Sequence, residues 1–196
     1  LTDESIVTGL QARQPCRFES VNLEQLPDPL KSLIKVETPA EYEGFITSKW
    51  RSENQSSETK ITNPRAIILD VAHNPQGIQR MIYDLFSQYP MCRFRAVVGF
   101  SAKKDHEDCL RMLIRDMKRI HLVHAKNERA MDVAQLRKAA EEVIDQEIIH
   151  FSPILADDVE GGSVEATIRQ ALEDCEDDEI LVICGSIYLM QEARKA

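Results

Sequence analysis

Residues 67–77, with the sequence Ile-Ile-Leu-Asp-Val-Ala-His-Asn-Pro-Gln-Gly, constrain the fold of this chain more than any other segment. The apolar run that opens the segment contains β-branched residues and predicts a buried strand. Asn74 is a preferred helix N-cap, and Pro75 is a preferred first helical residue. Asp70 and His73 are therefore expected where a strand ends and a helix begins. In an open α/β sheet, ligands bind at this edge, beside helix N-termini that attract anions.

The pattern of strand followed by helix repeats from about residue 65 to the end of the chain. Apolar runs predict strands at 66–69, 95–100, 120–124, 148–151 and 180–184. Apolar residues at helical spacing predict helices at 76–88, 106–117, 133–144, 163–175 and 187–194. This alternation predicts an α/β fold, in which a Rossmann-like, mostly parallel sheet carries helices on both faces.

The first 64 residues are less regular than the rest of the chain. A short edge strand is expected at 18–22, a helix at 39–50 and a polar surface loop at 52–60. The chain starts with a leucine instead of a methionine. Residues 1–11 are therefore expected to be the end of a helix that belongs to an upstream domain of a longer protein.

The acidic balance of the chain limits its partners. Asp and Glu number 33 against 24 Lys and Arg, which gives a net charge of −9. This balance argues against a nucleic-acid partner, because binding to a phosphate backbone needs a basic surface. The acidic runs at 157–160 and 173–179 are expected to be solvated helix ends and loops. No apolar run approaches the roughly 20 residues of a membrane span, so no membrane partner is expected.

The cysteines and histidines give no sign of a disulfide framework or a metal site. The five cysteines are an odd number without a CxxC pair, a pattern typical of reduced thiols in a cytoplasmic protein. The N-terminus lacks the basic and apolar segments of a secretory signal. His121 and His124 are three residues apart in an expected strand, so they should face opposite sides of the sheet. This spacing argues against a shared metal ion.

Asp70 and His73 are the first candidates for a functional site. The carboxylate of Asp70 can accept hydrogen bonds from sugar hydroxyls, and the ring of His73 can donate to an anion. Their spacing alone also fits a second interpretation, in which Asp70 only caps the turn and His73 is an ordinary surface histidine.

Three further segments bring polar residues toward the same edge. Lys103 or Lys104 follows the second expected strand and offers a point charge to a carboxylate or phosphate. Ser186 follows the last strand and suits an N-cap whose hydroxyl can hold a carboxylate. Arg17 precedes the edge strand and can bind phosphate. An exposed basic turn, an ordinary cap and a surface ion pair remain the alternative interpretations.

The usual nucleotide and nucleophile motifs are missing from this sequence. It contains no GxGxxG, no GxxxxGK[ST] and no GxSxG. The chain therefore lacks a dinucleotide fingerprint, a triphosphate cradle of its own and a hydrolase nucleophile elbow.

Taken together, residues 17–19, 70–75 and 183–189 resemble the C-terminal domain of folylpolyglutamate synthase, a member of the Mur ligase superfamily. The bifunctional dihydrofolate synthase/folylpolyglutamate synthase enzymes are equally similar. The resemblance covers nearly the whole chain, with two departures. Cys16 and Lys103 stand where the family usually has a glycine and an acid. In addition, residues 23–64 are longer than the family pattern and are expected to form a surface insertion.

The resemblance implies an ATP-dependent ligase that adds L-glutamate to a folate through an acyl phosphate. ATP and Mg²⁺ would be held mainly by the protein's own N-terminal ATPase domain. Residues 1–14 would be the tail of that domain and a linker, and residues 15–196 would form the glutamate-binding domain. The isolated chain would be inactive. The family also implies a monomer with a cytoplasmic or mitochondrial location.

The resemblance assigns a role to five residues and assigns no metal ligand within this chain. Arg17 would reach the ATP phosphates, and Asp70 would contact the ATP ribose. His73 would act catalytically at the incoming glutamate, and Lys104 and Ser186 would bind that glutamate. Two alternatives stay open: a Mur-type ligase that adds another amino acid, and a non-catalytic α/β regulatory module.

Overall fold

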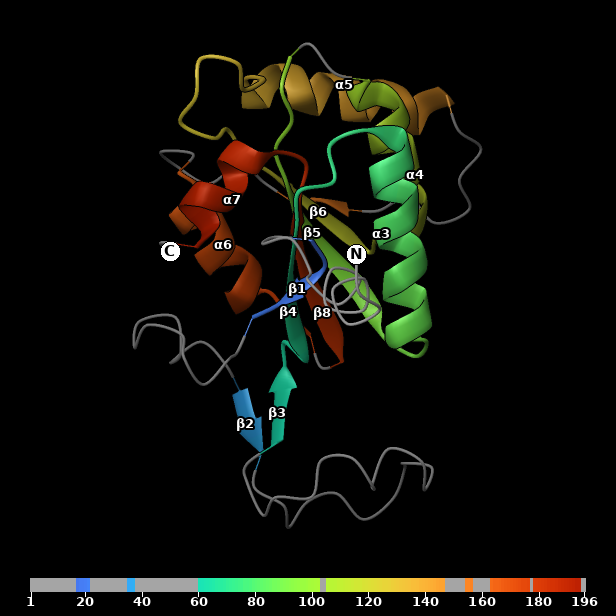
Figure 1. The fold of residues 1–196 in the computed structure, drawn as a ribbon, viewed down its shortest axis with the longest axis vertical. Helices are drawn as coiled ribbons and strands as arrows, with labels where there is room; N and C mark the ends of the chain where they lie inside the picture. The colour runs from blue at the N-terminus through green and yellow to red at the C-terminus, as the bar shows by residue number, and fades with distance from the viewer. Residues whose placement is uncertain are drawn as a thin grey trace, which may run out of the picture.

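The computed structural model describes residues 17–21, 35–37, 60–102, 105–146, 154–156, 163–176 and 178–194 (Figure 1). Its elements, in chain order, are β1 (Glu19–Ser20), β2 (Lys35–Glu37), β3 (Lys60–Asn63), β4 (Ala66–Asp70), α3 (Pro75–Gln88), β5 (Arg93–Val98), α4 (His106–Asp116), β6 (Arg119–Leu122), α5 (Val133–Gln146), β7 (Ile154–Leu155), α6 (Val164–Glu173), β8 (Glu179–Cys184) and α7 (Ile187–Ala193).

Six strands form one sheet in the order β1-β4-β8-β5-β6-β7. Strand β1 is antiparallel to β4, and the other neighbouring pairs are parallel. Parallel neighbours need crossover connections, which the intervening helices supply. The predicted α/β fold with a mostly parallel sheet is confirmed.

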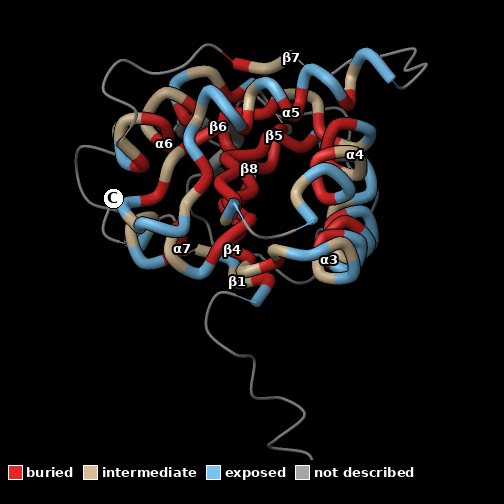
Figure 2. The backbone as a smooth tube through the Cα atoms, turned by 90° about the horizontal axis from the view of Figure 1, so that it is seen from above, coloured by how far each residue is buried: buried red, intermediate tan, exposed pale blue. Residues whose placement is uncertain are grey.

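The helices cover both faces of the sheet, as Figure 2 shows in a view from above. Helices α3, α4 and α5 pack on one face, against alternate residues of the strands such as Ile68 and Val182. Helices α6 and α7 pack on the other face, against the residues between them, such as Leu69 and Ile183. Because both faces are covered, β4 and β8 are buried along their whole length.

Local sequence explains where α3 begins. The Asn74 side chain accepts a hydrogen bond from the backbone N–H of Gly77, and Pro75 opens the helix. These two residues satisfy one free backbone donor and remove another, which is why this pair favours helix initiation. The cap predicted from the sequence is therefore confirmed.

Strands β2 and β3 form a separate antiparallel pair beyond the amino end of β4 (Figure 1). Both lie within the range 23–64 that the sequence predicts to be an insertion, and the insertion itself stays a prediction. The loop expected at 52–60 included Lys60, but Lys60 is the first residue of β3. The helix predicted at 39–50 and the segment 1–11 lie outside the described residues.

Several strands begin or end at other residues than the sequence predicts. Strand β5 begins at Arg93 and ends at Val98, whereas a strand at 95–100 was expected. Strand β1 covers only Glu19–Ser20. The strand expected at 148–151 falls outside the described residues, and the strand that pairs with β6 is β7, Ile154–Leu155. The limits of α3 to α7 agree with the predictions to within two residues.

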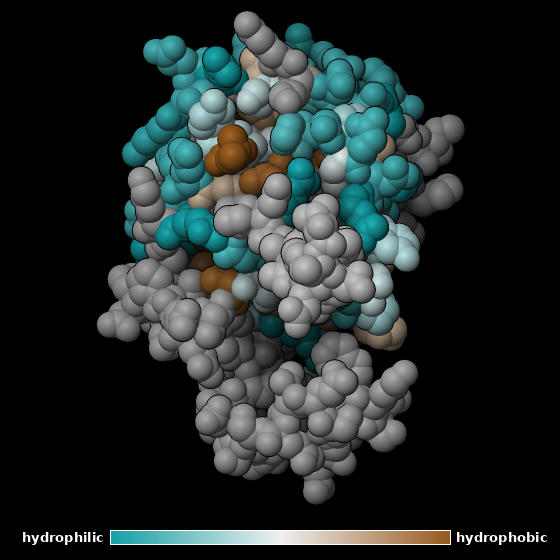
Figure 3. All heavy atoms as spheres, viewed as in Figure 1, coloured by the Kyte–Doolittle hydropathy of each residue, from teal (hydrophilic) through white to brown (hydrophobic). Residues whose placement is uncertain are grey.

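The described surface is largely hydrophilic on the face shown in Figure 3. Among the described residues, the large hydrophobic side chains that are exposed belong to Tyr83, Phe86, Met91 and Ile187. Among the residues that the structure describes, no helix is both long and apolar enough to cross a bilayer. The described cysteines, Cys92, Cys109, Cys175 and Cys184, are free thiols.

Candidate functional site

The carboxyl ends of the central strands lie level with one another. Cys184, the last residue of β8, is in register with Asp70 of β4 on one side and Val98 of β5 on the other. After β4 and β5 the chain turns to α3 and α4 on one face, but after β8 it turns to α7 on the opposite face (Figure 2). Loops that diverge in this way mark the edge where open α/β sheets bind ligands.

Asp70 ends β4 and holds two backbone segments. Its Oδ1 accepts a hydrogen bond from the N–H of Ala72 at 2.7 Å, and its Oδ2 accepts one from the N–H of Phe18 at 3.0 Å. Arg17 Nη1 lies 3.9 Å from Oδ1. Burial raises the pKa of the Asp70 carboxyl above its usual range, and these N–H donors and Arg17 oppose that shift.

His73 lies in the turn between β4 and α3 and is half-buried. Its Nδ1 is 2.8 Å from the carbonyl oxygen of Val71. A carbonyl can only accept a hydrogen bond, so Nδ1 carries the proton in this contact. In the neutral ring Nε2 then has a free electron pair that can accept a hydrogen bond from a ligand.

Two glycines set the spacing between these turns. Gly185 has φ +113°, and a Cβ placed there would lie 2.5 Å from the carbonyl oxygen of Gly99. The Gly185 N–H donates to the carbonyl of Ala72 at 2.8 Å, which ties the turn after β8 to the turn that carries His73. Only a residue without a side chain allows so close an approach in this backbone conformation.

Ser186 follows directly and is buried, with 6% of its surface exposed. It is the N-cap of α7, and its hydroxyl accepts a hydrogen bond from the N–H of Tyr188 at 3.3 Å. The sequence prediction of an N-cap at Ser186 is confirmed, and its contact with a ligand carboxylate stays a prediction.

The described part of the turn after β5 does not include the two lysines that the sequence analysis proposes for the site. Lys103 and Lys104 both lie outside the described residues. Ser101 forms an isolated antiparallel bridge with Ala130, and the Ala102 N–H donates to the Arg129 carbonyl at 3.0 Å. The structure therefore brings Arg17, Asp70, His73 and Ser186 to one edge, and it leaves the role of the lysines a prediction.

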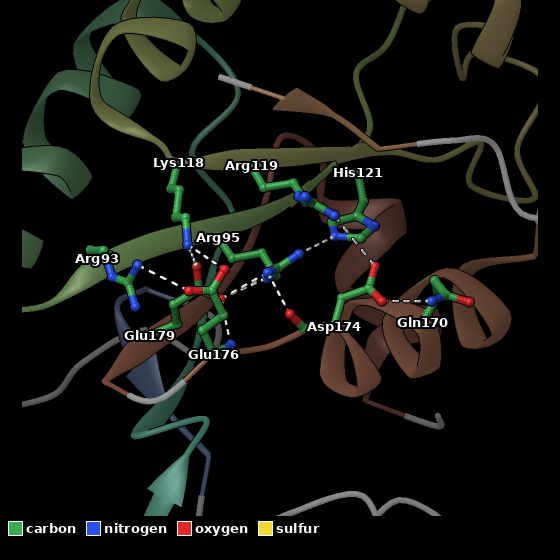
Figure 4. Close-up of polar contacts among 9 residues, drawn as sticks. All are labelled: Arg93, Arg95, Lys118, Arg119, His121, Gln170, Asp174, Glu176 and Glu179. Atoms are coloured by element: carbon green, nitrogen blue, oxygen red, sulfur yellow. Dashed lines mark hydrogen bonds and ion pairs between the residues drawn. The ribbon is translucent and has the colours of Figure 1, made fainter. Parts of the chain in front are cut away.

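The opposite, amino edge of the sheet contains a buried ionic cluster that the sequence analysis missed (Figure 4). Arg95 of β5 donates from Nε to Glu179 Oε2 at 2.9 Å and from Nη2 to the carbonyl of Asp174 at 2.6 Å. Its Nη1 lies 3.1 Å from His121 Nε2. Arg95 is 1% exposed and Glu179 is 0% exposed.

Cationic side chains surround the rim of this cluster. Lys118 Nζ lies 3.5 Å from Glu179 Oε1 and pairs with Glu176, which also pairs with Arg93 at 3.1 Å. The expectation that the acidic run 173–179 is solvated is therefore wrong at Glu179. The residue begins a buried strand, where the carboxylate is compensated by Arg95.

The two histidines of the third predicted strand lie in different environments. His121 is in β6 and is 1% exposed, and its Nδ1 has no hydrogen-bond partner within the described ranges. His124 lies after the end of β6, and its Nδ1 is 3.1 Å from the carbonyl oxygen of Met131. The expectation that both belong to one strand is therefore wrong, because β6 ends at Leu122. Burial, followed by the charge of Arg95, lowers the pKa of His121 to about 4.

The sequence carried one signal for the buried cluster. Arg95 is the one charged residue in the otherwise apolar run 94–98 of β5. Glu179 directly precedes the apolar run of β8. A charged residue within a buried strand needs a partner, and the register of β5 with β8 supplies it.

The sequence matches a family model described as Mur ligase, glutamate ligase domain, over residues 55–187. The match covers more than half of the chain. The chain therefore belongs to the Mur ligase family and contains its glutamate ligase domain. A comparison with curated proteins gave no match.

Several solved structures share this fold. A bifunctional folylpolyglutamate synthase/dihydrofolate synthase from Yersinia pestis, complexed with AMPPNP and a Mn ion, matches with 23% identity and a TM-score of 0.61, over 100% of this chain and 34% of that chain. A structure of the same kind of enzyme with Mn, AMPPNP and L-glutamate bound matches with 23% identity and a TM-score of 0.59, over 100% and 36%. The folylpolyglutamate synthase of Mycobacterium tuberculosis complexed with ADP matches with 20% identity and a TM-score of 0.53, over 69% and 32%. This chain thus spans about a third of the length of these proteins.

Proposed function

We propose that this chain is the glutamate-binding part of an ATP-dependent ligase that joins L-glutamate to a folate carboxylate through an acyl phosphate. One observation carries the proposal: Arg17, His73 and Ser186 lie at the same carboxyl edge of the sheet, where the loops diverge, and His73 and Ser186 fall within the Mur ligase match. Similar structures were solved with ADP, AMPPNP, Mn and L-glutamate bound, which supports the same substrate classes.

The chemistry of such a ligation fits the groups at this edge. Attack of an amine on an acyl phosphate needs the phosphates neutralised and the amine held in line with the acyl carbon. Arg17, together with Asp70, forms the nucleotide side of the edge. His73 and Ser186 form the glutamate side. We also assign Lys104 to the glutamate side on the basis of the family resemblance alone.

His73 has the most specific role in this proposal. With Nδ1 donating to Val71, the free electron pair of Nε2 accepts a hydrogen bond from the glutamate amine as it approaches the acyl carbon. The Ser186 hydroxyl, at the cap of α7, donates to a glutamate carboxylate. Both side chains therefore orient the nucleophile and leave the activation of the folate to the rest of the protein.

The described part of this chain has no cluster of three or more metal-ligating side chains, namely His, Cys, Asp or Glu. ATP and its metal would be held mainly by an N-terminal domain, in agreement with the length of the similar structures.

The test is glutamate-dependent ADP release by the complete protein, with tetrahydrofolate and dihydropteroate as separate acceptors. Turnover with tetrahydrofolate alone indicates a folylpolyglutamate synthase, and turnover with both indicates a bifunctional enzyme. Turnover with neither acceptor overturns the folate assignment, and a screen of other amino acids then tests a different Mur-type ligase.

A second test concerns the chain by itself. Because it supplies only part of each site, we expect calorimetry with ATP or L-glutamate to give affinities weaker than micromolar. Micromolar or tighter binding of either ligand would contradict the division of the site between two domains.

A further inference from the structure

The carboxylate of Asp70 joins two parts of the chain that are far apart in sequence. Its hydrogen bond to the Phe18 N–H spans 52 residues, while its bond to the Ala72 N–H spans two. Asp70 is 5% exposed, so nearly all of its surface is covered by the protein itself. The residue thus fastens the backbone before β1 to the turn after β4.

Phe18 has a backbone conformation that needs such support. Its φ is +45°, a left-handed value that aromatic residues rarely adopt, and its side chain is buried. Conformations of this kind persist where the surroundings over-determine them, and they gather at functional sites. The buried ring on one side and the carboxylate on the other supply that constraint.

The consequence of this arrangement is the position of Arg17. The residue directly precedes Phe18, and 47% of its side chain is exposed while its guanidinium stays 3.9 Å from Asp70 Oδ1. We propose that Asp70 is a positioning residue, whose carboxylate fixes the backbone at Phe18 and so holds the Arg17 cation over the carboxyl edge of the sheet. We call the two hydrogen bonds from the Phe18 and Ala72 N–H groups to Asp70 the clasp. The binding of nucleotide phosphate by Arg17 rests on the function proposed above, whereas the clasp does not.

This role differs from direct contact between Asp70 and a nucleotide. Each carboxylate oxygen uses one lone pair for a backbone hydrogen bond and keeps a second, so the positioning role is compatible with the ribose contact that the family resemblance implies. The positioning part of the effect on a nucleotide is exerted through Arg17. Substitution of Asp70 should then act in the same way as substitution of Arg17, and the two effects should overlap.

The first experiment uses the chain alone and needs no substrate. Asp70→Asn keeps the shape of the side chain but presents an NH2 group to one of the two N–H donors. Amide exchange measured by NMR is expected to speed up about tenfold or more at Phe18, with core amides such as Ile183 unchanged. The Arg17 Nε–Hε resonance is expected to shift. Unchanged exchange at Phe18 together with an unchanged Arg17 resonance would overturn the proposal.

Asp116→Asn is the matched control. Asp116 is a partly covered carboxylate at the end of α4 that pairs with Arg115. This variant should leave Phe18 and Arg17 unchanged. If Asp70→Asn unfolds the chain, the clasp is measured in the wild-type chain as the scalar coupling between the Phe18 amide nitrogen and the Asp70 carboxyl carbon. The absence of that coupling would also overturn the proposal.

The second experiment uses the complete ligase and a double-mutant cycle of Arg17→Ala and Asp70→Asn. Each single variant is expected to raise KM for ATP about tenfold or more with a smaller effect on kcat, and the double variant should be little worse than either. Effects that multiply would show that Asp70 acts on the nucleotide independently of Arg17. If the protein has no ligase activity, the proposed function fails, while the exchange measurement still decides the clasp.

Discussion

The two edges of the central sheet use charge in opposite ways. At the amino edge, Arg95 and Glu179 are buried and paired with each other. At the carboxyl edge, Arg17 is half exposed and the half-buried His73 bonds a backbone carbonyl through Nδ1. The amino edge has its charges compensated internally and serves stability. The carboxyl edge has polar groups that are held by the backbone but remain available to a ligand.

This contrast follows from what burial costs. A buried charge must have its partner within the fold, because leaving it unpaired costs several kcal/mol. A site has to leave some of its polar groups incompletely paired until a ligand arrives. Substitutions at the amino edge should therefore reduce stability, and substitutions of contact residues at the carboxyl edge should mainly reduce activity.

The largest effect is expected from Arg95→Leu. It leaves Glu179 with a buried charge and should lower the free energy of unfolding by about 3–5 kcal/mol. Urea denaturation followed by circular dichroism measures this change. Arg80→Leu, which breaks an exposed pair with Asp84, is the control and should leave the midpoint nearly unchanged. A loss below about 1 kcal/mol for Arg95→Leu would show that the buried charges of the amino edge do not serve stability.

The next effect is a pH dependence that arises from His121. Its pKa is lowered to about 4 in the folded chain, whereas an unfolded histidine has a pKa near 6.5. As the pH falls below about 6.5, the unfolded state binds a proton that the folded state rejects. The free energy of unfolding should therefore fall by about 3 kcal/mol between pH 6.5 and pH 4 and then level off.

His121→Asn isolates this contribution. The difference between the pH profiles of the wild-type chain and this variant removes the other titrating groups. A difference that stays constant across this range would show that His121 is not buried in the neutral form.

A smaller loss of stability is expected from Gly185→Ala. The added methyl would lie 2.5 Å from the Gly99 carbonyl oxygen at a φ of +113°, which should cost about 2 kcal/mol. Thermal unfolding measures this loss. Gly77→Ala is the comparison variant, because its new methyl would meet a side-chain atom, Asn74 Oδ1, at 3.0 Å in a helical backbone, and it should cost less than the backbone clash at Gly185. Equal losses of stability for the two variants would show that the close approach of Gly185 to the Gly99 carbonyl does not require a glycine.

The smallest change in stability, and the largest in activity, is expected from His73→Ala. The chain loses one hydrogen bond to Val71, so the free energy of unfolding should change by about 1 kcal/mol or less. On the proposed function, turnover of the complete protein should fall by about a hundredfold or more. His124→Ala is the control, since that half-buried histidine also bonds a backbone carbonyl through Nδ1. Wild-type turnover of His73→Ala would refute its role.

The local parts of the site were predictable because their signals are local. The apolar run of β4, the Asn74 cap and the Ser186 cap each depend on a few consecutive residues. The amino edge was not predictable in the same way. Glu179 stands in an acidic run that looks solvated, and its partner Arg95 is 84 residues away. Only the insertion of β8 between β4 and β5 brings the two together.

The sequence by itself determined the alternation of strands and helices, the mostly parallel sheet and the edge at which Asp70, His73 and Ser186 lie. These follow from hydrophobic periodicity and capping, which act over a few residues. The tertiary structure alone decided that Asp70 clasps Phe18, that Gly185 touches Gly99 and that Arg95 neutralises Glu179. The physical reason is that hydrogen bonds and ion pairs between distant residues depend on strand order and register, which local patterns do not specify.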